Sequence, residues 1–165
     1  MAPALKTSLA DEKETLDLGA ALAPCLEPGL TIYLRGELGA GKTTLVRGML
    51  RALGHAGPVR SPTYALVEVY DLSSLNLHHF DFYRFHDPRE WIDAGFRECF
   101  NGRNITVIEW PEKAGPWLPP ADVDIAFDFL DEGREVTLVS SSLAGQKCLA
   151  RLEQYCASPR ASSSP

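Results

Sequence analysis

The sequence predicts a single α/β domain in which helices pack against a mixed, mainly parallel central sheet. Residues 36–43 contain two glycines five positions apart followed by Lys42 and Thr43, which is the spacing of a phosphate-binding P-loop. A short apolar segment precedes this loop, and a helical pattern of apolar residues follows it. Pairs of apolar runs joined by polar turns then indicate antiparallel hairpins. Together these features predict the three-layer P-loop NTPase fold with added hairpins.

The N-terminal part of the chain predicts a helix, a strand, the P-loop and a second helix. Residues 1–8 carry no clear pattern, and we expect them to be frayed. Asp11 and Glu14 have the spacing of a capping box, so a helix should begin there and end before Pro28. Residues 31–34 predict the strand that leads into the P-loop. The helix after the loop should end at Gly54.

The middle of the chain predicts a hairpin, a helix and a buried strand. Residues 65–70 and 77–83 read as two strands joined by a short polar connection. Residues 88–96 predict a helix with Asp87 as its N-cap and Pro88 at its first position. Residues 105–110 predict a short apolar strand that carries Glu109 near its end and stops at Pro111.

The C-terminal part predicts a second hairpin and a last helix. Residues 122–129 and 134–140 should form strands joined by a turn that contains Gly133. A helix should follow over residues 142–156, with an apolar stripe that includes Cys148, Tyr155 and Cys156. We assign residues 1–156 to one domain and expect the Ser/Pro-rich residues 157–165 to be disordered.

Composition narrows the functional classes. The chain has 165 residues and a net charge of −6, which argues against a broad basic surface that grips DNA or RNA directly. No apolar run approaches the length of a membrane span and no signal peptide is recognisable, so we expect a cytoplasmic protein without membrane contact. Four cysteines show neither C-x-x-C nor metal-ligand spacing, which favours reduced thiols.

The residue types in the P-loop follow from phosphate chemistry. Backbone N–H groups that curl round phosphate oxygens need conformations that glycine tolerates best, and the next helix directs its free N–H groups and dipole at the same anion. Lys42 should reach the β- and γ-phosphates, and the Thr43 hydroxyl should ligate Mg²⁺. The predicted nucleotide-binding residues of this segment are Gly36, Gly39, Ala40, Gly41, Lys42, Thr43 and Thr44.

Two acidic residues are candidates for the metal side of the site. Glu109 ends an apolar strand, where a carboxylate is costly unless a cation pairs with it, so we predict that it ligates Mg²⁺. The alternative is an exposed acid that begins a loop. Asp81 shares one strand face with His79, opposite Phe80 and Phe82. Asp81 could polarise an attacking water or hold the water shell of the metal, or this polar face could simply be solvated.

Two further candidates lie outside these strands. Residues 61–63 occupy the place where P-loop proteins commonly carry a loop that senses the γ-phosphate, and Thr63 supplies a hydroxyl there. The same Ser-Pro-Thr sequence is also an ordinary turn. Arg134 follows a turn glycine and could either reach the nucleotide or remain on the surface. Lys42, Thr63 and Asp81 are thus the candidate catalytic residues.

Three other functions use a P-loop. A small-molecule kinase would need a mobile polar lid with arginines. The arginines that could form one, Arg84, Arg89, Arg97 and Arg103, lie in a segment that is rich in aromatic residues. A GTPase would carry Asn-Lys-x-Asp and Asp-x-x-Gly segments, and neither occurs, so ATP is the expected nucleotide. A nucleotide-binding regulator without hydrolysis stays open. The kinase is the main alternative to an ATPase.

Four motifs occur in a characteristic order, at residues 36–44, 61–64, 79–84 and 108–111. With the helix that begins near Asp11, they resemble the bacterial tRNA threonylcarbamoyladenosine biosynthesis protein TsaE family over residues 8–155. The resemblance implies a small Mg²⁺-dependent ATPase required to modify the adenosine beside the anticodon of tRNAs that read codons starting with A. The group transfer itself would lie on partner proteins, TsaD and TsaB, whose turnover this ATPase supports. Contact with tRNA would then be indirect, through that complex.

The resemblance also implies roles for single residues. By position, the loop from Gly39 to Thr43 would hold the phosphates, and Thr43 with Glu109 would ligate Mg²⁺. The 61–63 segment would act as a switch loop, with Asp81 near the γ-phosphate. Glu12 would help to hold the adenosine end, and Arg134 would contact the nucleotide.

Overall fold

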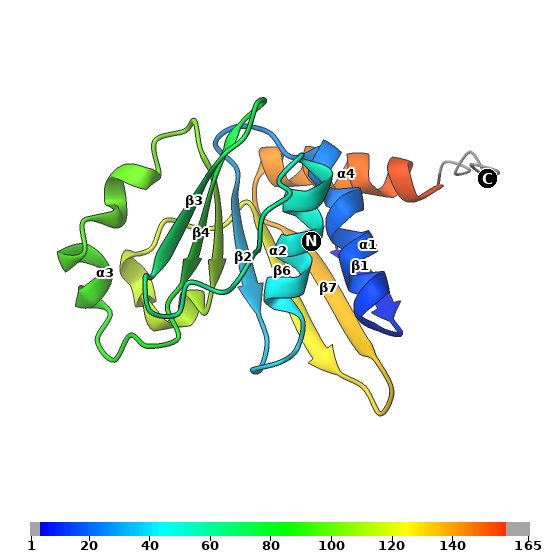
Figure 1. The fold of residues 1–165 in the computed structure, drawn as a ribbon, viewed down its shortest axis with the longest axis horizontal. Coiled ribbons are helices and arrows are strands. Elements are labelled where there is room, and N and C mark those ends of the chain that lie inside the picture. The colour runs from blue at the N-terminus through cyan, green and yellow to red at the C-terminus, as the bar shows by residue number, and fades with distance from the viewer. Residues whose placement is uncertain (1–3, 158–165) are drawn as a thin grey trace.

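The computed structural model describes residues 4–157, whose strands form one sheet in the order β1-β7-β6-β2-β5-β4-β3 (Figure 1). The strands are β1 (Ala4–Leu9), β2 (Thr31–Arg35), β3 (Val67–Asp71), β4 (Asn76–Asp81), β5 (Ile105–Glu109), β6 (Val123–Phe129) and β7 (Arg134–Ser140). The helices are α1 (Glu12–Leu22), α2 (Lys42–Ala52), α3 (Arg89–Asp93) and α4 (Leu143–Ala157), with short 3-10 turns between strands. None of the helices in this part of the chain is long and apolar enough to cross a membrane.

The sheet has a parallel centre with antiparallel pairs on both sides. Strand β2 pairs in parallel with β5 and β6, and β4 pairs in parallel with β5. The β3–β4 and β6–β7 pairs are the two predicted hairpins, and β1 adds an antiparallel edge next to β7. The predicted mixed sheet with a parallel core and added antiparallel hairpins is therefore confirmed, with three parallel and three antiparallel pairings among the described strands.

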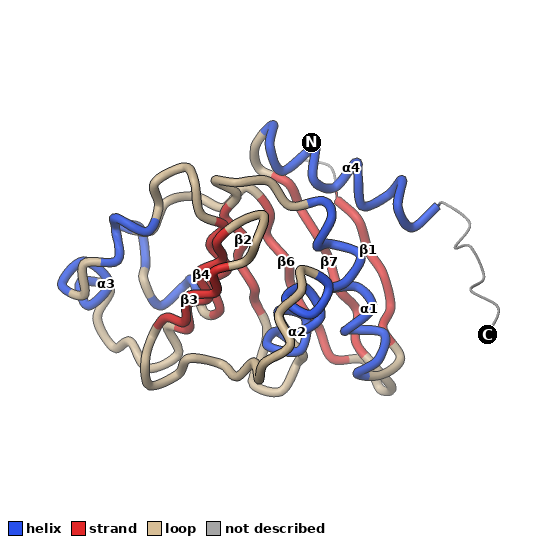
Figure 2. The backbone as a smooth tube through the Cα atoms, turned by 45° about the horizontal axis from the view of Figure 1, so that its top comes forward, coloured by secondary structure: helices blue, strands red, loops and turns tan. Residues whose placement is uncertain are grey.

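Side chains that alternate along the strands build one apolar core on each face of the sheet. On β2, Ile32 and Leu34 join the larger core, which includes buried residues of α1, α2 and α4, whereas Tyr33 joins the smaller core. The smaller core is aromatic and contains Phe80, Phe82 and Trp91 from β4, the turn after it and α3. Helices α1, α2 and α4 thus cover one face of the sheet and α3 packs on the other, which gives the predicted three layers. Figure 2 shows α3 at the far left, apart from the other three helices.

Helices α1 and α2 lie side by side on the larger core because two glycines allow a close approach (Figure 1). A Cβ atom at Gly48 would lie 2.3 Å from the backbone oxygen of Leu16, and one at Gly19 would lie 2.3 Å from that of Leu45. Asp11 caps α1 as predicted, because its carboxylate accepts from the Glu14 N–H at 2.9 Å. The Glu14 carboxylate accepts from the Ala10 N–H instead of completing the capping box at Asp11. This packing places the first turn of α1 beside the start of α2.

Some local predictions were wrong. Residues 4–9 are not frayed, because β1 pairs with β7 along its whole length, and residues 1–3 lie outside the described residues. Helix α3 is shorter than the predicted helix over residues 88–96, since Gly95 adopts a positive φ of 74°. Pro88 precedes its first residue, although the Asp87 carboxylate does accept from the Arg89 N–H at 2.9 Å.

The last helix also departs from the prediction in detail. Cys148, Leu149 and Leu152 are buried as its apolar stripe requires, but Tyr155 and Cys156 are exposed. They lie in the last turn of α4, which ends at Ala157. Residues 158–165 of the predicted tail lie outside the described residues.

Candidate functional site

The P-loop leaves the carboxyl end of β2 and turns directly into α2. Gly36 has a φ of 148° and Gly41 a φ of 116°, conformations that side chains rarely adopt. Gly41 is the N-cap residue of α2, so the free N–H groups of the first helical turn face the concave side of the loop. The predicted strand–loop–helix arrangement is confirmed, and its geometry is the one expected of an anion-binding helix N-terminus.

Neighbouring parallel strands bring two acids to this loop. Strands β2, β5 and β4 are adjacent, so their carboxyl ends meet at one edge of the sheet. Glu109 on β5 is opposite Asp81 on β4 in the register, and the two residues are 3% and 4% exposed. The Thr43 hydroxyl donates to the two carboxylate oxygens of Glu109 at 3.2 and 3.0 Å. Glu109 is thus buried at the P-loop, not exposed at the start of a loop.

Lys42 is buried under the mouth of the loop, with 4% of the residue exposed. Its ammonium donates to the Gly36 carbonyl, and its Nζ lies 3.7 Å from the ring centroid of Trp110. Burial lowers the pKa of Lys42, while the carboxylates of Glu109 and Asp81 act in the opposite direction. A bound phosphate would therefore meet a cation that is poorly solvated and ready to pair.

Asp81 ties the 61–63 segment to the end of β4. Its Oδ2 accepts from the hydroxyls of Ser61 and, at 3.2 Å, of Thr63. The backbone N–H of Asp81 also donates to the Leu66 carbonyl at 3.1 Å, and Leu66 has a positive φ of 70°. A non-glycine residue in this conformation stores strain, so the loop is held by several bonds in a costly geometry.

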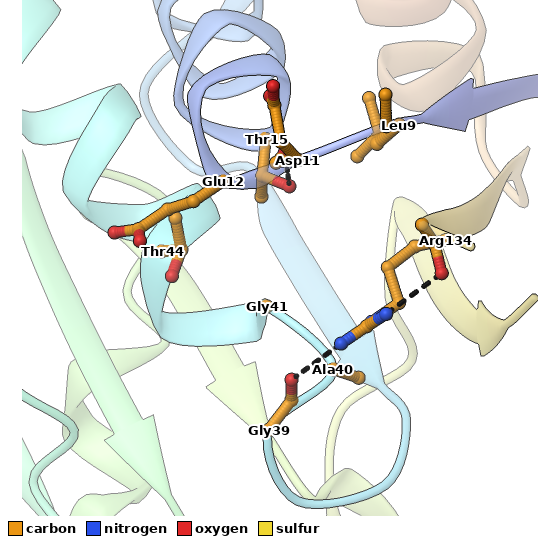
Figure 3. Close-up of a pocket in the computed structure, with 11 residues that line it drawn as sticks. Leu9, Asp11, Glu12, Thr15, Gly39, Ala40, Gly41, Thr44 and Arg134 are labelled. Carbon is orange, nitrogen blue, oxygen red and sulfur yellow. Dashed lines mark hydrogen bonds between the residues drawn. The ribbon is translucent and has the colours of Figure 1, made fainter.

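A cavity of about 400 Å³ lies between the P-loop and the N-terminal segment (Figure 3). Glu12 and Thr15 come from the first turns of α1, and Arg134 reaches across from β7 to within 3.5 Å of the Gly39 carbonyl. Small-molecule sites commonly enclose about 300–1,000 Å³. The structure therefore joins Glu12 and Arg134, which lie on opposite sides of the P-loop in the sequence, to one cavity.

A second cavity of about 220 Å³ shares the P-loop wall and lies over its other side. It holds the residues predicted for phosphate, metal and water: Lys42, Thr43, Thr63, Asp81 and Glu109. Gly39, Ala40, Gly41 and Thr44 line both cavities. The arginines considered for a kinase lid line neither cavity. The guanidinium carbon of Arg84 instead lies 3.9 Å from the ring centroid of Tyr64.

Several residues of the site were missed in the sequence. His79 is fully buried and its Nε2 lies 2.6 Å from the Glu109 carboxylate, so the polar face of β4 is not solvated. Ser61 bonds to Asp81, and Leu9 at the end of β1 lines the larger cavity. The alternation of His79 with Phe80 did place it on the Asp81 face, but a polar pattern alone cannot tell a solvated face from a paired one.

The donors present fit a nucleoside triphosphate with Mg²⁺. Thr43 and Glu109 supply hard oxygen ligands close together, which is what Mg²⁺ prefers. Lys42 and the first N–H groups of α2 supply the positive side for phosphate oxygens. The larger cavity leaves room next to the loop for the nucleoside end.

The sheet order and the glycine-bounded loop before α2 define a protein with the P-loop NTPase fold. Comparison with known proteins narrows this class. A family profile described as Threonylcarbamoyl adenosine biosynthesis protein TsaE matches residues 9–136. The chain therefore belongs to the TsaE family, as its motifs predicted.

Relatives and a solved structure agree with this assignment. The tRNA threonylcarbamoyladenosine biosynthesis protein TsaE of Haemophilus influenzae is 42% identical over 145 residues, which cover 85% of this chain and 92% of the relative. The protein of the same name from Bacillus subtilis is 34% identical, covering 82% and 85% of the two chains. A crystal structure of Bacillus subtilis YdiB superposes with a TM-score of 0.82 at 27% identity, covering 94% of this chain and 98% of that one.

Proposed function

We propose that the chain is the ATP-binding, Mg²⁺-dependent ATP-hydrolysing component of the tRNA threonylcarbamoyladenosine machinery. In this proposal it binds the complex of TsaD and TsaB and supports the turnover of that complex, while the group transfer occurs on the partner. The relatives' names place them in threonylcarbamoyladenosine biosynthesis, and the P-loop supports a nucleotide-driven part in that pathway.

The observation that carries the proposal is the meeting of Thr43 with Glu109 at the P-loop. A hydroxyl that follows the loop lysine and a buried acid at a strand end are the usual ligands of Mg²⁺ in P-loop enzymes. When bound, the ion neutralises charge that develops on the phosphates. Asp81 lies in the same cavity and accepts from Ser61 and Thr63, which would let the loop respond to a γ-phosphate.

Hydrolysis by the isolated chain should be slow. Lys42 supplies the positive charge in the lining of the smaller cavity, and an additional arginine from a partner commonly accelerates hydrolysis by about 10³–10⁵-fold in P-loop enzymes. A ligand shifts a conformational equilibrium only through contacts that differ between the two states. For ATP to control partner binding, the partners would therefore contact a segment that senses the nucleotide, and the 61–63 loop is the proposed one.

The test is ATP hydrolysis measured with and without purified TsaD and TsaB. We expect a low rate for the chain alone, a higher rate in the complex, and loss of both with Glu109→Ala. Equal rates with and without the partners would contradict the proposed coupling. A Glu109→Ala variant with normal Mg²⁺-dependent hydrolysis in the complex would contradict the metal assignment.

A second experiment separates this function from a kinase. The tagged chain is used to capture partners from cell extract in the presence of ATP, of ADP or of neither. ATP-dependent capture of the TsaD–TsaB pair supports the proposal. ATP-dependent phosphorylation of a nucleoside or small alcohol by the isolated chain would instead favour the kinase.

A further inference from the structure

We propose that His79 is a positioning residue that fixes the Glu109 carboxylate before Mg²⁺ and nucleotide bind. The inference rests on the proposed Mg²⁺ site. His79 is 0% exposed, and its Nε2 lies 2.6 Å from Oε2 of Glu109, which is itself 3% exposed. A carboxylate taken out of water needs hydrogen-bond partners. Among the described residues, Thr43 and His79 are the hydrogen-bond partners of the Glu109 side chain.

Among the described residues, the His79 ring has one hydrogen-bond partner, the Glu109 carboxylate. A carboxylate oxygen accepts, so Nε2 of His79 must carry the hydrogen that is donated to Glu109. The other ring nitrogen, Nδ1, is buried without a hydrogen-bond partner in the described part of the chain. Buried polar atoms without partners are rare, which makes a purely space-filling histidine at this position an expensive choice.

The sheet fixes where the ring can be. Strands β4 and β5 are parallel, with His79 opposite Val107 and Asp81 opposite Glu109, so His79 precedes Glu109 by one pleat on the same face. The neighbouring rings of Phe80 and Phe82 anchor β4 in the smaller core. The donor is therefore held by a rigid strand, whereas the Glu109 side chain has several rotatable bonds.

As a consequence, the two carboxylate oxygens of Glu109 have different hydrogen-bond partners. Oε2 accepts from His79 and at 3.0 Å from Thr43, while Oε1 has a longer contact of 3.2 Å with Thr43 alone. Holding one oxygen restricts the rotation of the carboxylate and keeps the other near the P-loop. Partners of metal-ligating groups act in this way, and their mutation typically costs about 10–100-fold in metal affinity or activity.

The test compares two substitutions of equal length. Gln at position 79 keeps a terminal N–H donor, and Met fills similar space without one. ATP affinity is measured by calorimetry with Mg²⁺ and with EDTA, and the ratio of the two dissociation constants gives the coupling between metal and nucleotide. For His79→Met we expect that coupling to fall by about 10–100-fold with the EDTA affinity unchanged. His79→Gln should recover most of the loss.

The matched control is His78→Met. His78 directly precedes His79 on β4 and points to the other face of the sheet. Its ring meets the Phe80 ring edge-on, with the two ring centroids 6.4 Å apart. This variant should keep the native coupling. Thermal unfolding of each variant without ligand measures any loss of stability separately.

Each outcome decides the question. Native coupling in His79→Met, or equal losses in the Met and Gln variants, would overturn the positioning role. Failure of both variants to fold would also overturn it and assign His79 to the core. Failure of the native chain to bind ATP would refute the proposed nucleotide site itself, and is seen in the same titration before any variant is made.

Discussion

Replacing Lys42 with Met should separate ligand binding from stability. Lys42 is 4% exposed and contacts the Gly36 carbonyl and the Trp110 ring. Burial lowers its pKa even though the Glu109 and Asp81 carboxylates act in the opposite direction, so the ammonium is less favourable in the folded ligand-free chain than in water. Met keeps the unbranched stem against Trp110 and removes the charge. The ligand-free variant should therefore unfold at no lower temperature than the native chain.

The effect on ATP binding should be large. A hydrogen bond to a charged group contributes about 1.5–3 kcal/mol, and Lys42 is proposed to contact both the β- and the γ-phosphate. Losing two such bonds costs about 3–6 kcal/mol, and each 1.4 kcal/mol is about a tenfold change in affinity. The dissociation constant of ATP should thus rise by about 10²–10⁴-fold.

Calorimetric titration with ATP and Mg²⁺ measures this change, and thermal unfolding measures the stability. Lys147→Met is the matched control, because Lys147 is exposed on α4 and its loss changes the net charge equally. An affinity within tenfold of the native value would refute the phosphate role of Lys42. A similar loss in the Lys147 variant would show that net charge, and not the site, is responsible.

Three further changes test the fold and the larger cavity. Gly48→Ala should lower the free energy of unfolding by about 1–3 kcal/mol in urea titrations, because the new Cβ would lie 2.3 Å from the Leu16 backbone oxygen; an unchanged value would contradict the close approach of α1 and α2. Burial raises the pKa of Tyr33 to about 12, and its hydroxyl donates to the Pro119 carbonyl. Since the unfolded chain releases this proton near pH 10, about 2–3 kcal/mol of stability present below pH 10 is lost as the pH rises to about 12. Tyr33→Phe should show a smaller loss in urea titrations over that range, and an identical loss would count against this origin. Arg134→Ala should weaken ATP binding by about 10–100-fold but leave inorganic triphosphate binding unchanged in the same calorimetric assay, because Arg134 lines the larger cavity and not the smaller one; equal losses for both ligands would place it at the phosphates instead.

The features that depend on short stretches of sequence could be predicted. The P-loop is specified within eight residues, and the alternation of Phe80 and Phe82 with polar neighbours identified the aromatic core of β4 correctly. The N-cap at Asp11 and both hairpins are also local signals, and the structure has them. In each case the residues that determine the element are neighbours in the chain.

The features that depend on the order of strands in the sheet could not be predicted from the sequence. Strand β1 has a short, mixed sequence, and among the described strands it pairs with β7, more than a hundred residues later in the chain. Its first residues therefore looked unstructured in the sequence. His79 meets Glu109 because β4 pairs with β5, and that pairing leaves no local pattern. The polar face of β4 could therefore be solvated or paired as far as the sequence shows, and only the packed sheet distinguishes the two.

The position of β5 would link the proposed nucleotide binding to the completion of synthesis. β5 inserts between β2 and β4 although it follows both in the chain, and Thr43 meets Glu109 only after 66 more residues have been made. The larger cavity further requires Arg134. A ligand stabilises only the form that binds it, by an amount that grows with the logarithm of its concentration. Cellular nucleotide would therefore protect finished chains from proteolysis and give no protection to chains that are still emerging from the ribosome.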